Sequence, residues 1–367
     1  MKEVIVHPLP RLRAEIRDVP IPVPADDEIV IKVVVAGSNV KGSLPDWSHI
    51  TALNIAVNSG DDIAGVVYSL GSFVQNTGEF RVGDRVAAFH RMLTPGGAYA
   101  EYAVAPAHTT FIIPDNISFE EAATIPLVAL TAAISLFRRQ CLPPPWSPLP
   151  ASAGPLPLVV YGASSALGTF AIKLARLSNI HPIIAICGAS HDVVDGLLDF
   201  SRGDRIIDYR QGVEAMKTAV KDALAGLEAR HALDAISSKG TWVPLAQMLH
   251  GSATSGPFQV SVVAGSNRYD DEGIPSSVEL LYTYVGSGHY GSYKPSMPKQ
   301  PADKDSVKFD VEFAYVFYRY LSRLLARGDF CGHPFEVIPG GLAGVEEGLN
   351  KLKNSEARGV KYVYRIR

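Results

Sequence analysis

The stretch LVVYGASSALG, residues 158–168, decides the fold of this 367-residue chain. Four apolar residues, then small residues, then the run TFAIKLARL predict a strand, a tight turn and the start of a helix. Backbone N–H groups and the positive dipole end at such a turn bind phosphate, and bulky side chains there would block its approach. Glycine stands at Gly162 and Gly168, whereas the places between them hold Ala163, Ser164, Ser165, Ala166 and Leu167. An ordinary strand-to-helix turn is therefore the alternative to a dinucleotide site.

Strand-like and helix-like segments alternate after this stretch. Apolar runs predict strands at 182–188, 205–209, 232–237 and 258–265, with helices near 192–202, 212–229 and 241–250 between them. Apolar strands joined by helical crossovers specify an α/β fold with a doubly wound parallel sheet, which is a nucleotide-binding architecture. The place of the quoted stretch on the first strand of this sheet favours the dinucleotide site. Residues 267–308 are predicted as exposed loops around the strand-like segment VELLYTYVG.

The part of the chain before residue 125 has a different character. Short β-like runs lie at 4–7, 28–37, 62–70, 84–89 and 98–105, each punctuated by Gly, Pro or Asp. Because no crossover helices are predicted between them, we expect a small barrel-like β domain. A helical bridge begins at Ser118 and is interrupted by Pro126, and the Pro-rich run 142–157 predicts a surface linker.

The last part of the chain contains a predicted helix at 311–328 and a predicted strand at 360–366 that returns to the first domain. The domains expected from this organisation are a substrate-binding and catalytic domain, a nucleotide-binding domain and a returning C-terminal segment. They cover residues 1–135, 136–300 and 301–367, respectively.

Composition narrows the class of protein further. With 47% hydrophobic and 19% charged residues the chain is globular, and its length exceeds that of one ordinary domain. A net charge of −3 argues against a nucleic-acid partner or a polybasic membrane surface. Three separated cysteines, Cys141, Cys187 and Cys331, cannot form a disulfide framework or a four-cysteine zinc site. We expect a cytoplasmic protein that is not inserted in a membrane, since apolar stretches of spanning length are missing.

The end of the second strand of the nucleotide domain indicates which dinucleotide binds. An NAD-specific site places a carboxylate there, on the ribose 2′-hydroxyl, whereas a 2′-phosphate needs donors instead. Here Ser190 and His191 stand at the tip, and Tyr209 and Arg210 follow the next strand. NADPH is therefore favoured. Two alternatives stay open, because a shifted strand end would bring Asp192 to the ribose and because His191 can simply face water.

Six runs along the chain carry a family resemblance. They are GDDIAG at 60–65, VGDRVAAF at 82–89, the run from Gly96 to Ala132, the run from Tyr161 to Leu177, IIDYR at 206–210 and the run from Gly332 to Ile366. In this order they resemble the zinc-independent, quinone oxidoreductase-like branch of the medium-chain dehydrogenase/reductase superfamily, and most of all its fungal trans-acting enoyl reductases of polyketide biosynthesis. The resemblance implies a GroES-like β-barrel domain plus a Rossmann sheet, the fold of that superfamily.

The sequence departs from the zinc enzymes of this superfamily. At the places of their zinc-binding Cys and His, this chain has Asn39 and Asp61. We expect no metal, because a thiolate and an imidazole ligand are both replaced. Without a Lewis acid, hydride delivery to an electron-poor C=C bond or a quinone is favoured over alcohol oxidation.

The resemblance also implies site residues. The expected cofactor contacts are Lys41, Gly42 and Ser43 at the nicotinamide ribose, Gly162, Ser164, Ser165, Ala166, Leu167 and Gly168 at the pyrophosphate, Ser190, His191, Tyr209 and Arg210 at the 2′-phosphate, and Arg358 and Gly359 from the C-terminal segment. The expected acyl pocket consists of Leu127, Val128, Leu130, Thr131 and Ser135, for which plain helix packing is the alternative.

The function expected from the resemblance is NADPH-dependent reduction of an activated C=C bond, in an enoyl thioester or polyketide intermediate. Lys41 is the candidate for enolate stabilisation or proton delivery, with Asn39 and Thr131 as hydrogen-bonding positioners, although water or backbone amides can replace Lys41. The substrate is a small molecule or a carrier-bound acyl group, so a polyketide synthase is an expected partner, and the enzyme is a monomer or homodimer. One alternative is an NADPH-dependent quinone or enone oxidoreductase, and another is a weakly catalytic NADPH-binding or partner-docking protein.

Overall fold

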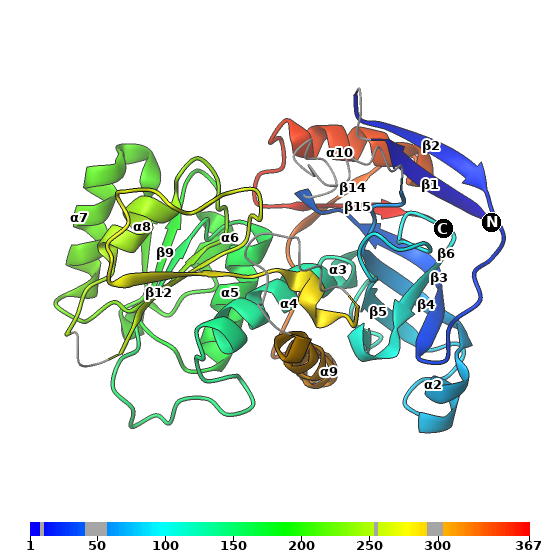
Figure 1. Ribbon diagram of the computed structural model, residues 1–367, viewed down its shortest axis with the longest axis horizontal. Coiled ribbons are helices and arrows are strands. Elements are labelled where there is room, and N and C mark those ends of the chain that lie inside the picture. The colour runs from blue at the N-terminus through cyan, green and yellow to red at the C-terminus, as the bar shows by residue number, and fades with distance from the viewer. Residues whose placement is uncertain (8–10, 41–56, 253–255, 292–303) are drawn as a thin grey trace. The chain divides into compact units, whose positions relative to one another are not determined.

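The computed structural model describes the chain except for residues 8–10, 41–56, 253–255 and 292–303 (Figure 1). It divides into two compact units. Unit 1 contains Met1–Leu127, Gly286–Ser292 and Val307–Arg367, and unit 2 contains Val128–Val285 and Tyr293–Ser306. The Pro-rich run 142–157 therefore belongs to unit 2. The boundaries of the functional domains expected from the sequence stay a prediction.

The core of unit 2 is a parallel sheet. Its strands are β8 (Leu158–Tyr161), β9 (Ile183–Cys187), β10 (Arg205–Asp208), β11 (His231–Asp234), β12 (Phe258–Val262) and β13 (Val278–Tyr282). They follow the order β10-β9-β8-β11-β12-β13, which is that of a doubly wound nucleotide-binding sheet. This confirms the predicted fold. Strand β13 lies in the segment VELLYTYVG, which the sequence predicts as strand-like between exposed loops, and it pairs with β12 in parallel register.

Helices cover this sheet. They are α5 (Ala166–Leu177), α6 (Asp192–Asp195), α7 (Val213–Leu224) and α8 (Trp242–Met248). Apolar residues of α7 and α8, such as Val220 and Leu245, pack with Val159 and Val260 of the sheet in a buried cluster. The helix predicted over 192–202 is shorter in the structure: α6 ends at Asp195, and the chain later makes the 3₁₀ turn Phe200–Arg202.

Unit 1 is built on a mainly antiparallel sheet. Its main path runs through β14 (Phe335–Ile338), β15 (Lys361–Arg365), β3 (Glu28–Gly37), β4 (Asp62–Leu70), β5 (Arg85–Phe89) and β7 (Thr110–Ile112), while β6 (Tyr102–Pro106) pairs with β3. A separate pair consists of β1 (Lys2–His7) and β2 (Arg13–Asp18). Strand β15 pairs with β3 although the two are far apart in the sequence, so the final strand joins the sheet of unit 1.

Helices complete unit 1 and connect it to unit 2 along the chain. They are α2 (Ser72–Thr77), α3 (Phe119–Ala122), α4 (Pro126–Ala133), α9 (Lys304–Arg327) and α10 (Val345–Lys353), with a π-helical turn at Ile134–Arg139. Ser118 caps α3 by accepting the Glu121 N–H at 3.1 Å, as its position in the sequence predicts. Helix α4 starts afresh at Pro126, because proline lacks the N–H needed to continue α3.

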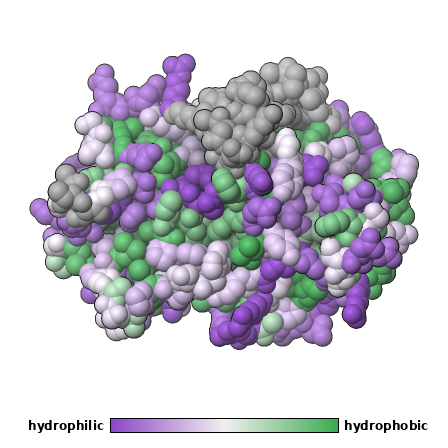
Figure 2. All heavy atoms as spheres, turned by 60° about the horizontal axis from the view of Figure 1, so that its bottom comes forward, coloured by the Kyte–Doolittle hydropathy of each residue, from purple (hydrophilic) through white to green (hydrophobic). Residues whose placement is uncertain are grey.

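No helix in the described part of the chain combines the length and the apolar character that a membrane crossing needs. On the face seen in Figure 2, hydrophilic and hydrophobic residues are interspersed.

A cluster of histidines lies in unit 1 beside the end of β5. His289 is fully buried, and its Nε2 lies 3.1 Å from both the carbonyl oxygen of Phe89 and Oγ1 of Thr109. Its Nδ1 has no hydrogen-bond partner among the described residues. The ring of His108 lies 5.8 Å away. Burial lowers the pKa of both histidines, and a charge on His108 would lower that of His289 further.

These histidines make the stability of unit 1 sensitive to acid. Above the ordinary histidine pKa of about 6.5, both rings are neutral in the folded and the unfolded chain. Below it the unfolded chain binds protons that the folded unit resists, so the free energy of unfolding falls towards the lower folded-state pKa values, by up to about 1.4 kcal/mol per pH unit for each group. Urea titrations between pH 8 and pH 5 measure this loss. We expect a smaller loss in His289→Gln and an unchanged one in His250→Gln, whose ring is exposed; equal losses in all three proteins would contradict the assignment.

Candidate active site

The turn after β8 requires glycine at its first position. Gly162 has a φ of +74°, and a Cβ there would lie 2.5 Å from Cγ1 of Ile236, which follows β11. Ser165 then caps α5 by accepting the N–H of Gly168 at 3.1 Å. The cap starts α5 at Ala166, so its first-turn amides lie at the carboxyl end of β8, where phosphate groups bind in such folds.

Gly168 allows α5 to pack directly on this turn. A Cβ at this position would lie 2.4 Å from the carbonyl oxygen of Gly162 and 2.6 Å from Cα of Ala163, so even alanine does not fit without displacing backbone. This is the role that the last glycine of a dinucleotide turn performs. The two glycines that the chain retains are therefore the two that its backbone geometry requires.

The turn lies where the direction of the sheet's connections reverses. Strand β8 pairs with β9 on one side and with β11 on the other. In doubly wound sheets, ligands bind outside the carboxyl ends of the strands at this switch point. The glycine turn, the small side chains and the close approach of α5 therefore fit a dinucleotide pyrophosphate.

The residues predicted to select the cofactor gather at the neighbouring strand ends. Ser190 and His191 follow β9, and Tyr209 and Arg210 follow β10, whose last residue is in register with Cys187. The ring of Tyr209 covers Gly188, because a Cβ added to Gly188 would lie 3.0 Å from Cε1 of Tyr209. The His191 side chain is 62% exposed, and Tyr209 is also exposed. This strand edge is thus polar and open.

Asp208, the last residue of β10, is an acid at this edge and is absent from the predicted cofactor contacts. Its carboxylate accepts hydrogen bonds from the guanidinium of Arg210, with Nη2 to Oδ2 at 2.6 Å. These hydrogen bonds hold the pKa of Asp208 down to about 2, so it carries a full charge at neutral pH. Arg210, predicted to contact phosphate, is therefore already paired with a carboxylate. Asp192, the other acid, lies 3.8 Å from His191.

Unit 1 contains a buried polar cluster around Lys361. The Lys361 ammonium donates to Oδ2 of Asp62 at 2.5 Å, to Oδ1 of Asn39 at 3.3 Å and to the carbonyl oxygen of Thr124 at 3.2 Å. Asp62 also accepts the Asn39 amide at 2.9 Å and the backbone N–H of Leu127 at 2.7 Å. Both charged side chains are almost completely buried. The cluster joins the ends of β3, β4 and β15 to the start of α4.

The hydrogen bonds of this cluster bear on the role predicted for Asn39. The sequence predicts that Asn39 positions substrate, but its side chain amide is bound on both sides, to Asp62 and to Lys361. Asp61, at the place of a zinc-binding histidine, is also buried. Among the described residues, no group of three or more His, Cys, Asp or Glu side chains could hold a metal ion. A lysine between the apolar residues of the run VKYVYRI was the available sign of this cluster.

The residues expected to line an acyl pocket are all buried along α4 and the π-helical turn. Leu127, in unit 1, donates its N–H to Asp62. Ser135, in unit 2, donates to the carbonyl oxygen of Thr131 at 2.8 Å and lies 3.1 Å from Oγ1 of Thr283. Because its hydroxyl is used inside the helix and the sheet packing, helix packing accounts for Ser135. The pocket itself stays a prediction.

The other predicted cofactor contacts are Lys41, Gly42, Ser43, Arg358 and Gly359. Lys41, Gly42 and Ser43 lie outside the described residues. Arg358 is exposed in unit 1, and Gly359 has a φ of +68° just before β15. The structure thus brings together the predicted contacts of unit 2, from Gly162 to Arg210, and the assignment of every predicted site residue stays a proposal.

Comparison with known proteins defines the class. Residues 25–115 match the family model of the alcohol dehydrogenase GroES-like domain. A trans-enoyl reductase of Gibberella fujikuroi is 37% identical over 346 residues, 94% of this chain and 92% of the relative. A trans-enoyl reductase of Aspergillus sclerotiorum is 30% identical over 384 residues, 99% of this chain and 100% of the relative.

Solved structures share the fold. The CurK enoyl reductase matches with a TM-score of 0.69 at 17% identity, covering 99% of both chains. A quinone oxidoreductase from Coxiella burnetii matches with a TM-score of 0.65 at 18% identity, covering 100% of this chain and 99% of the other. The fold is therefore that of the medium-chain dehydrogenase/reductase superfamily, as the sequence predicts. Within it, this chain belongs to the trans-enoyl reductase family of oxidoreductases.

The buried pair of Lys361 and Asp62 leads to a stability prediction. Lys361→Met leaves the Asp62 carboxylate buried without its cation, so we expect a loss of about 3–5 kcal/mol in the unfolding free energy of unit 1. Adding Asp62→Asn to this variant removes the unpaired charge and should recover part of the loss. Lys2→Met is the control, because its ion pair with Asp18 is exposed and contributes less than about 1 kcal/mol. Chemical denaturation of the wild type and the three variants measures these unfolding free energies. Equal losses for Lys361→Met and Lys2→Met would refute the role of the pair.

Proposed function

We propose that this oxidoreductase uses NADPH to reduce the C=C bond of an α,β-unsaturated acyl thioester held by a polyketide synthase. The observation that carries this proposal is the 37% identity to a trans-enoyl reductase along 94% of the chain. The glycine turn of unit 2 supports it, because its geometry fits a dinucleotide pyrophosphate. The open, polar strand edge after β9 and β10 supports the choice of NADPH.

The chain's own residues would hold the cofactor in three places. The first-turn amides of α5 and the Ser164 region would bind the pyrophosphate, and Ser190 and His191 would donate to the 2′-phosphate. Arg210 neutralises Asp208, which would otherwise repel that phosphate. When bound, the dinucleotide supplies the hydride.

Reduction at the β-carbon leaves negative charge on the thioester oxygen and requires a proton at the α-carbon. We assign the stabilisation of this charge to Lys41 and the orientation of the acyl group to Thr131. The role of Asn39 is indirect: through Asp62 and Lys361 it would fix the backbone from which residues 41–43 continue. Apolar side chains of α4, among them Val128, would exclude water from the reacting bond.

Substrate comparison tests the reaction. The protein should oxidise NADPH with a carrier-bound enoyl thioester more efficiently, in kcat/KM, than with the same acyl group on a short thiol, and more efficiently than with small quinones. The reason is that a partner-bound substrate adds binding energy that a free one lacks. A preference for quinones would indicate a small-molecule oxidoreductase instead. Tight NADPH binding without turnover of any of them would indicate a non-catalytic protein.

The 2′-phosphate contact has its own test. His191→Ala should raise the KM for NADPH about tenfold and leave the KM for NADH unchanged, because a hydrogen bond to a charged group contributes about 1.5–3 kcal/mol. Lys217→Ala is the matched control, since Lys217 is a cation on the same unit that pairs with Glu214. Steady-state kinetics with both nucleotides gives the answer. An equal change for NADPH and NADH would remove His191 from the 2′-phosphate site.

A further inference from the structure

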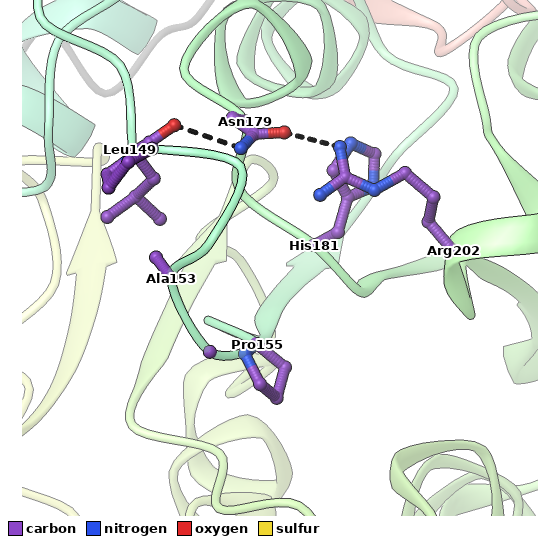
Figure 3. A pocket seen from close by; sticks show the side chains of 8 residues that line it. Leu149, Ala153, Pro155, Asn179, His181 and Arg202 are labelled. Carbon is purple, nitrogen blue, oxygen red and sulfur yellow. Dashed lines mark hydrogen bonds between the residues drawn. The ribbon is translucent and has the colours of Figure 1, made fainter.

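A cavity of about 180 Å³ lies in unit 2 beside the amino ends of β8 and β9 (Figure 3). Its lining consists of Leu149, Pro150, Ala153, Gly154, Pro155, Asn179, His181 and Arg202. Strand β8 runs from Leu158 to Tyr161, so the cavity is at the opposite end of this strand from the glycine turn. The predicted nucleotide contacts play no part in it.

One wall of the cavity is the Pro-rich run 142–157, which is held in place by hydrogen bonds. The N–H of Leu149 donates to the carbonyl oxygen of Ser178 at 3.0 Å, and that of Leu156 donates to the carbonyl oxygen of His181 at 2.8 Å. The side chain amide of Asn179 donates to the carbonyl oxygen of Leu149 at 2.9 Å. The wall is therefore part of the folded unit, and its prolines leave it with few N–H groups and an apolar surface.

The opposite side of the cavity is polar. In Figure 3, Asn179, His181 and Arg202 lie together, facing Leu149, Ala153 and Pro155. His181 is only 6% exposed, and its Nδ1 lies 2.8 Å from the carboxylate of Asp204. Asp204 is fully buried and also accepts the N–H groups of Ile183 and Asp199. Because the Asp204 carboxylate accepts all of these hydrogen bonds, Nδ1 of His181 is the donor, and the pair fixes the histidine ring in the cavity wall.

Arg202 adds a positive charge to this polar side. One of its N–H groups donates to Oδ1 of Asn179 at 2.5 Å, and its guanidinium forms no ion pair with a carboxylate that the structure describes. The neighbouring carboxylates are engaged elsewhere, since Asp204 binds His181 and Asp199 binds Ser201. The planar fork of an arginine is suited to two oxygens of one carboxylate.

We propose that this cavity binds a small carboxylate that bears a short apolar group. The carboxylate oxygens would contact the guanidinium of Arg202, while the apolar group would pack against Leu149, Pro150 and Pro155. An inorganic anion would leave this apolar wall without contacts, so it fits less well. The proposal is independent of the proposed reductase function, because it uses neither the glycine turn nor the strand ends that would hold NADPH.

Binding of butyrate to the full-length protein tests the proposal, with inorganic phosphate as the second probe. We expect saturable binding of one butyrate in ligand-observed NMR and calorimetry, and weaker binding of phosphate. Arg202→Met should weaken butyrate binding at least about tenfold, and Arg202→Lys less, because it keeps the charge but loses the fork. Asn179→Gly should also weaken it, since glycine accepts the φ of +61° at this position but does not hold the guanidinium.

The control is Lys221→Met, which removes an exposed cation of α7 from the same unit. It should leave butyrate binding unchanged, and NADPH affinity should be unchanged in every variant, which also shows that each is folded. Absence of saturable butyrate binding overturns the proposal. So does tighter binding of phosphate than of butyrate, or an equal loss of butyrate binding in Arg202→Met and Lys221→Met.

Discussion

The buried ion pair between Lys361 and Asp62 is the constraint around which unit 1 is arranged. An ammonium and a carboxylate are tolerated in an apolar interior only when each is paired and its remaining hydrogen-bonding positions are filled. Here Asn39, the Thr124 carbonyl and the Leu127 N–H fill them. These partners come from two separate parts of the chain, one after β3 and the other at the start of α4. The need to satisfy two charges therefore fixes the mutual positions of β3, β4, β15 and the start of α4.

At one edge of the unit 2 sheet, a negative charge has to be compensated. Asp208 places a full negative charge beside the position proposed for the 2′-phosphate, and the hydrogen bonds from Arg210 compensate it. The charges of Asp208 and Arg210 at the end of β10 therefore compensate each other. Ser190 and His191 provide hydrogen-bond donors after the neighbouring strand, β9. In the site proposed here, cofactor choice would depend on charge compensation between Asp208 and Arg210 as much as on direct contact.

Local patterns in the sequence predicted the features that depend on neighbouring residues. Strands β3 and β4 begin and end where their apolar runs do, at 28–37 and 62–70, and the turn of Gly162 lies where its small residues predict it. Strand β13 was not assigned to the sheet, because β12 and β13 are parallel without the intervening helix that usually marks such a pair. Short, exposed strands such as β2 carry too little alternation to be recognised.

The candidate site was likewise predictable only where it depends on residues that are neighbours in the sequence. The glycine turn and the polar residues after β9 and β10 follow from strand-to-loop transitions, which the sequence displays directly. The contact between Lys361 and Asp62 joins residues 299 positions apart, and only the pairing of β15 with β3 brings their strands together. The pairing of Arg210 with Asp208 depends on side chain geometry at a strand end, which composition and periodicity do not describe.

The late position of β15 in the chain also has a consequence for biosynthesis. Unit 2 is mostly one continuous segment, Val128–Val285, whereas the sheet of unit 1 needs Lys361–Arg365 beside β3. A ribosome releases the chain from the N-terminus onward, so unit 2 has all of its parallel strands before unit 1 has its last ones. During that interval Asp62 lacks its cationic partner, and burying its unpaired carboxylate is unfavourable. Unit 1, whose synthesis begins first, thus completes its sheet last. It can do so once the Lys361 ammonium pairs with Asp62.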